Sequence, residues 1–128
     1  MRGREDFQYS VLRVIPHVER GESINAGVVL FCRRLDFLGA RVGLDARALA
    51  AIAPGSQPAE VRAYLDGLVR VAAGDPSGGP IAALEPSERF HWLTAPSSTV
   101  VQPSPVHTGL TTDPAAELDH LFERLVAR

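Results

Sequence analysis

The order of strand-like and helix-like segments constrains the fold of this chain more than any other feature. Three segments rich in Val, Ile, Leu and aromatic residues come first, over residues 7–15, 26–33 and 37–44. Such runs, bounded by turn residues, are typical of β-strands. Helix-like segments follow, with one more short strand expected over 99–102. Because strands cluster before helices instead of alternating with them, we predict an α+β fold, with a small antiparallel sheet of about four strands and helices packed mainly on one face.

The predicted helices are bounded by residues that favour helix ends. Asp45 precedes an alanine-rich segment and is a favourable N-cap. Pro58 suits the first turn of a second helix, which we expect to end at Gly74, a common residue just beyond a helix C-terminus. Asp113 and Pro114 together predict the start of a C-terminal helix, whose leucines and phenylalanine are spaced along one face.

Composition and charge narrow the class of protein. The chain has 128 residues, enough for one domain, and we predict a single domain over 1–128. The net charge of -2 argues against general binding to nucleic acid or to acidic membranes. The single cysteine, Cys32, cannot form an internal disulfide, and no apolar segment follows the charged N-terminus. These features predict a cytoplasmic protein.

Two polar segments supply the candidate binding residues. One is the hydroxyl-rich stretch 97–112, which contains no Lys, Arg or Glu. The other is the connection 16–27 between the first two predicted strands, where loop residues held by strands could face a ligand. We expect the two segments to meet and to bind a protein partner or a small polar ligand through hydrogen bonds. The selected residues are Arg20, Asn25, Gln102, Ser104 and His107.

The preferred function is that of a binding module with an accessory or regulatory role and no chemical step, and a homodimer stays open. The alternative is a small enzyme acting on a polar or phosphorylated molecule, with His107 as acid/base and Arg20 holding an anion. None of the four histidines has the spacing of a local metal site, so we predict neither a metal nor a cofactor.

Two further expectations concern arginine and tryptophan side chains. A second alternative function is binding of single-stranded nucleic acid, for which several arginines would have to share one sheet face. Those arginines are Arg13, Arg33, Arg34 and Arg41. Trp92 is expected in the core, because large aromatic side chains contribute most to core packing, and an exposed Trp92 would be the first residue to test as a partner anchor. For Asn25 we also expect an Asx turn that bonds its own backbone.

Four blocks of the sequence, taken in order, resemble a known family. They cover residues 9–16 (Tyr-Ser-Val-Leu-Arg-Val-Ile-Pro), 19–32, 88–96 and 101–109. Together they are similar to the bacterial family called Domain of Unknown Function 3037, over almost the whole chain. The resemblance implies a small accessory or regulatory protein and assigns no catalytic residue.

Overall fold

The structure is a computed structural model that describes residues 3–97 and 99–128, so Ser98 of the hydroxyl-rich stretch lies outside the description. Five strands form one antiparallel sheet, which confirms the α+β class with one strand more than predicted. The strands are β1 (Glu5–Val14), β2 (Ile24–Cys32), β3 (Phe37–Val42), β4 (Val101–Pro103) and β5 (His107–Thr111).

β1 is the central strand of this sheet. One of its edges pairs with β2, which in turn pairs with β3. Its other edge is shared by two short strands: β4 pairs with residues 12–14 and β5 with residues 5–9. The sequence pattern predicted β4 approximately, over 99–102, but β5 was not predicted.

Three α-helices follow the first three strands in the chain, and a fourth α-helix follows β4 and β5. They are α1 (Ala46–Ile52), α2 (Pro58–Ala73), α3 (Pro86–Thr94) and α4 (Pro114–Leu125), and two short 3-10 turns, η1 (Pro76–Gly78) and η2 (Pro80–Ala83), connect α2 to α3. The predicted caps are confirmed. Asp45 accepts hydrogen bonds from the backbone N–H groups of residues 47 and 48, and Asp113 accepts one from Ala116. Gly74 ends α2 in the left-handed conformation, at φ 72.

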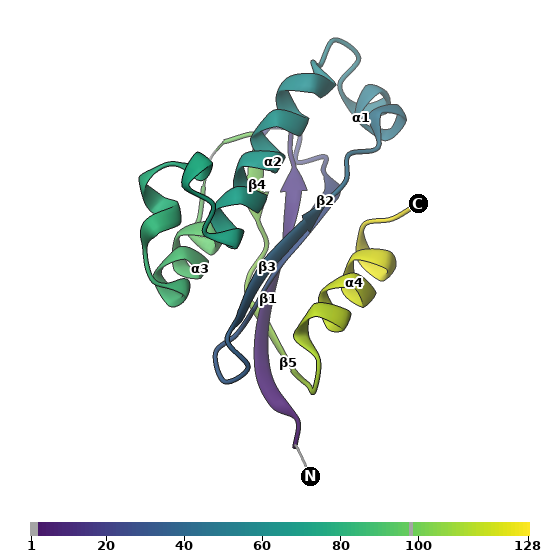
Figure 1. The fold of residues 1–128 in the computed structure, drawn as a ribbon. Helices are drawn as coiled ribbons and strands as arrows, with labels where there is room; N and C mark the ends of the chain where they lie inside the picture. Colours follow the sequence, from purple (N-terminus) through teal and green to yellow (C-terminus); the bar gives the residue numbers. More distant parts are fainter. Residues whose placement is uncertain (1–2, 98) are drawn as a thin grey trace.

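The helices cover the two faces of the sheet unequally. α1, α2 and α3 lie on one face, where residues such as Leu49, Leu65 and Phe90 pack against Leu12 and Val29. α4 alone lies on the other face, where Leu118, Leu121 and Phe122 pack against alternate residues of β2 (Figure 1). Most helices therefore share one face, as predicted, and the C-terminal helix closes a second, smaller core.

Candidate functional site

The hydroxyl-rich stretch reaches the last residues of β1, just before the connection 16–27 begins. The backbone N–H of Ile15 donates to the carbonyl of Val100 at 2.7 Å, and Gln102 pairs with Arg13 across the sheet. The contact is made by backbone pairing close to Pro16, at the start of the connection 16–27.

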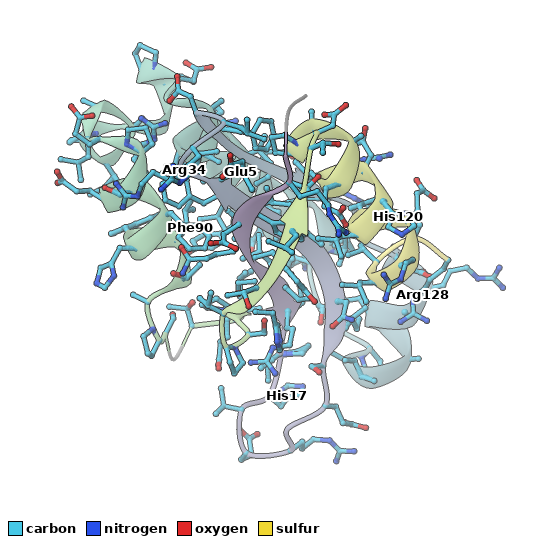
Figure 2. The ribbon with its side chains drawn as sticks, turned by 90° about the horizontal axis from the view of Figure 1, so that it is seen from below. Glu5, His17, Arg34, Phe90, His120 and Arg128 are labelled. Atoms are coloured by element: carbon cyan, nitrogen blue, oxygen red, sulfur yellow. The ribbon has the colours of Figure 1, made fainter. Side chains whose placement is uncertain are left out.

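Arg20 and His107 lie far from each other. Arg20 is in the loop beyond β1, while His107 pairs with Tyr9, and the rings of His107 and Tyr9 are 5.2 Å apart. Tyr9 and Val14 alone are separated by about 16 Å along an extended strand. Figure 2 shows His17, on the same loop as Arg20, at the bottom of the view, well apart from Glu5, the first residue of β1, in the upper half. The geometry therefore does not support an enzyme site that combines an Arg20 anion clamp with His107.

Arg20 is engaged by a neighbour within its own loop. Its Nε lies 2.7 Å from Oε1 of Glu22, and both side chains are largely exposed. The hydrogen bond from Arg20 is the main reason that the pKa of Glu22 lies below its ordinary value, and the same bond raises the pKa of Arg20. The loop turns at Gly21, whose φ of 72 favours glycine.

Asn25 and Ser104 have structural partners. Nδ2 of Asn25 donates to the carbonyl of Leu125 at 3.0 Å, so this side chain binds the C-terminal end of α4. The Asx turn expected for Asn25 is not the interaction its side chain makes. The hydroxyl of Ser104 accepts a hydrogen bond from the backbone N–H of Val11 at 2.9 Å, and the buried Ser10 donates to the carbonyl of Ser104 at 2.8 Å.

Gln102 and His107 differ in their exposure to solvent. Nε2 of Gln102 donates to the carbonyl of Thr99 at 3.0 Å, and the residue is half-buried. His107 is exposed on the outermost strand. Arg20, whose side chain is 62% exposed, and His107 are the candidates most open to solvent. The assignment of all five candidates as binding residues stays a prediction.

The arginines considered for nucleic-acid binding do not share one face. Arg41 lies on the α4 face, where its Nη1 is 3.1 Å from Oδ1 of Asp119 and its guanidinium lies over the ring of Phe122. Arg33 instead lies over the ring of Phe31, which packs in the core of the opposite face. The continuous basic surface that this alternative requires is therefore not formed by these side chains.

The prediction that Trp92 lies in the core is wrong. Trp92 is 43% exposed, whereas Phe90 and Leu93 of the same helix are buried. α3 has nine residues and contacts the core along one side only, and a helix turns about 100° per residue. Phe90 and Leu93, three residues apart, occupy that side, so Trp92 is left at its border.

Trp92 borders a groove that runs between α2 and the segment containing β4. The groove consists of three adjoining depressions with volumes of about 520, 270 and 210 Å³. The first two share Glu60, Val61 and Val100, and the last two share Tyr64 and Val101, which makes the surface continuous. We call this surface the α2 groove; it extends from Pro16 and His17 at one end to Trp92 and Pro96 at the other.

The α2 groove is mainly apolar and carries little charge. Tyr64 is 48% exposed and Val100 is 44% exposed, so large apolar side chains near its middle are open to solvent. Glu60 is the one carboxylate among its lining residues. A patch of this kind fits binding through apolar contact, with one position suited to a cationic group.

Parts of this groove belong to segments that the sequence singles out, but the groove itself has no sequence pattern. Val100 lies in the hydroxyl-rich stretch, His17 lies in the connection 16–27, and Trp92 was named as an anchor if exposed. Tyr64, which also lines the groove, is not among the predicted binding residues. The sequence signal that could have found it is an aromatic residue at the border of the apolar side of the helix, next to Leu65 and Leu68.

The comparisons with known proteins show the family of this α+β protein. The chain belongs to the family described as Protein of unknown function (DUF3037), which matches residues 9–126 of the 128 residues. No curated protein and no solved structure shows a significant match. Within residues 3–97 and 99–128, no group of three or more His, Cys, Asp or Glu side chains is placed to hold a metal ion. In the same residues, no helix combines the length and the apolar character needed to cross a membrane.

Proposed function

We propose that this protein is a binding module that holds an extended segment of a partner protein in the α2 groove. The observation that carries the proposal is the exposure of three large side chains, Tyr64, Trp92 and Val100, around one continuous apolar depression. Trp and Tyr are the residue types most enriched among those that dominate protein–protein binding energies. An accessory role that works by binding agrees with this surface and needs no chemical step.

The dimensions of the groove favour an extended segment as the occupant. Its lining residues along α2 run from Gln57, the residue that precedes the helix, to Leu68, which is about 16 Å along a helix axis. An extended chain spans this length with roughly five residues. Glu60, which lines the first two of the three depressions, would pair with a Lys or Arg side chain of the bound segment. The expected ligand is therefore a short extended peptide with apolar residues on both sides of a basic one.

Selection of peptides from a random displayed library on the immobilised protein tests the proposal. Selected peptides are synthesised with a fluorescent label, and their dissociation constants are measured by anisotropy. Tyr64→Ala and Trp92→Ala are each expected to weaken binding by at least about tenfold, as truncation of an anchoring residue does. Glu60→Arg is expected to weaken binding of peptides that contain a basic residue.

Leu84→Ala is the matched control, because Leu84 is 38% exposed and is not among the residues lining the groove. This variant is expected to bind as the wild type does. Peptides that bind the Tyr64 and Trp92 variants with unchanged affinity would overturn the proposal, as would a selection that enriches no common sequence.

A further inference from the structure

The outer edge of β5 has backbone groups without a strand partner. β5 lies at the border of the sheet and pairs only with β1 among the strands of the described residues. The side chains of His107, Thr108 and Leu110 on this strand are exposed. A border strand of this kind is a template on which another strand can pair.

The hydrogen bonds of β1 show which groups of β5 face outward. The N–H of Val11 donates to Ser104, and the carbonyl of Val11 accepts from the N–H of Ser104, so both groups point toward the β4 and β5 edge. Backbone direction alternates along a strand, so Tyr9 and Phe7 point their groups the same way. Their partners, His107 and Gly109, therefore direct their own N–H and C=O groups to β1.

It follows that Thr108 and Leu110 direct their N–H and C=O groups away from the sheet. Residues 107–111 include no Lys, Arg, Asp, Glu or Pro, the residue types that commonly prevent pairing at such an edge. Apolar side chains also flank the edge, with Val106 40% exposed and Leu110 52% exposed.

We infer that a second copy of this chain pairs with β5, antiparallel and across a two-fold axis at Gly109. This register places Thr108 of each copy opposite Leu110 of the other. Both residues present outward N–H and C=O groups, so each Thr108–Leu110 pair exchanges two N–H···O hydrogen bonds. The two sheets then join into one. The edge is neutral, so identical copies do not repel each other there, and it offers no charge that would select a charged partner instead.

Gly109 suits the position on the axis. The ring of Phe7 lies over Gly109 so closely that a Cβ there would be 2.5 Å from Cζ of Phe7. In the antiparallel arrangement the two Gly109 residues face each other as a pair without hydrogen bonds, the closer of the two pair types. Each Phe7 ring covers the glycine of its own copy, and the two rings become neighbours across the axis.

Two measurements test this dimer. Sedimentation over a concentration series compares the wild type with Thr108→Pro and Thr108→Val. The proline removes an outward N–H and no N–H used by β1, and it is expected to raise the dimer dissociation constant by at least about tenfold, because each dimer loses two hydrogen bonds. Thr108→Val keeps the N–H and is expected to dimerise as the wild type does. Circular dichroism establishes that each variant is folded.

Cysteine cross-linking tests the register without relying on the proline variant. Thr108→Cys and Leu110→Cys proteins, one carrying a mass tag, are mixed under mild oxidation. The opposed Cα atoms are about 5.5 Å apart in a hydrogen-bonded pair, which a disulfide can bridge. Mixed disulfide dimers are expected to exceed those formed by either variant alone, while Cys32 is buried in both. A protein that stays a 13.8 kDa monomer up to about 1 mM, or cross-linking without preference for the mixed pair, would overturn the inference.

Discussion

The ring of Phe7 lies directly over Gly109 on the neighbouring strand, and a Cβ at Gly109 would come within 2.5 Å of Cζ and 2.7 Å of Cε2 of that ring. Phe7 is 5% exposed and belongs to the core beneath α4, so the ring cannot move freely. Gly109→Ala is therefore expected to lower the free energy of unfolding by about 1–3 kcal/mol, the usual cost of overpacking. Urea unfolding of both proteins measures this change.

Gly55→Ala is the control for this substitution, because a Cβ at Gly55 would meet nothing within 4 Å. It is expected to leave stability unchanged or slightly raised. Adding Phe7→Leu should recover part of the loss in Gly109→Ala, since a smaller side chain frees the space. Equal stability of the Gly109→Ala and Gly55→Ala proteins would contradict the close contact.

Ser104 is expected to contribute to stability through its backbone contacts with β1. Ser104→Ala removes the acceptor of the Val11 N–H and leaves that donor unsatisfied near the core. An unpaired, partly buried donor costs about 1–3 kcal/mol. Thermal or urea unfolding should show a loss of this size, while peptide binding in the α2 groove is unchanged. Ser104→Ala with wild-type stability would indicate a role for this hydroxyl other than the structural one.

The exposure of Trp92 can be tested by fluorescence, since it is the single tryptophan of the chain. Its emission is expected to be strongly quenched by iodide or acrylamide in the folded protein, because 43% of the residue is open to solvent. Trp92→Phe should change the free energy of unfolding by less than about 1 kcal/mol, as surface substitutions do. Emission protected from both quenchers in the folded state would show that Trp92 is buried and would contradict its exposed position.

The ion pair between Arg20 and Glu22 predicts a pH effect with a definite sign. The hydrogen bond from Arg20 lowers the pKa of Glu22 in the folded protein. The pair therefore favours folding above the pKa of an unfolded glutamate, and this contribution is lost as the pH falls through the lowered folded value. NMR titration should show Glu22 shifting back toward its ordinary pKa in Arg20→Gln. Because both side chains are exposed, global stability is expected to change little.

Local signals in the sequence predicted the fold well, because caps and turns depend on near neighbours. Asp45 and Asp113 start helices because their side chains accept backbone hydrogen bonds, and Gly74 ends a helix because glycine readily adopts the left-handed conformation. β5 was not predicted for two reasons. Pro103 and Pro105 precede it and are typical of a loop, and its residues show little alternation between apolar and polar side chains. It becomes a strand by pairing with β1, which lies about a hundred residues earlier, and no local pattern encodes that contact.

The candidate site was harder to predict for the same reason. We expected the 16–27 and 97–112 segments to share one binding surface, whereas β4 and β5 occupy successive halves of one β1 edge. That arrangement separates His107 from the loop that holds Arg20. The exposure of Trp92 depends on which side of α3 packs against the core. Helical periodicity predicts the direction of Trp92 relative to Phe90 and Leu93, but not which of these directions faces the core.

The position of β1 between early and late strands has a consequence for how this chain folds during synthesis. Ser10 bonds to Ser104, a contact that joins residues 94 positions apart. One edge of the first strand must therefore stay unpaired until the ribosome has released the segment that carries β4 and β5. Contacts between residues so far apart in the sequence slow folding. A strand whose edge stays unpaired for long is prone to associate with other nascent chains. Chaperone protection of the first strand would thus matter most before the last quarter of the chain emerges.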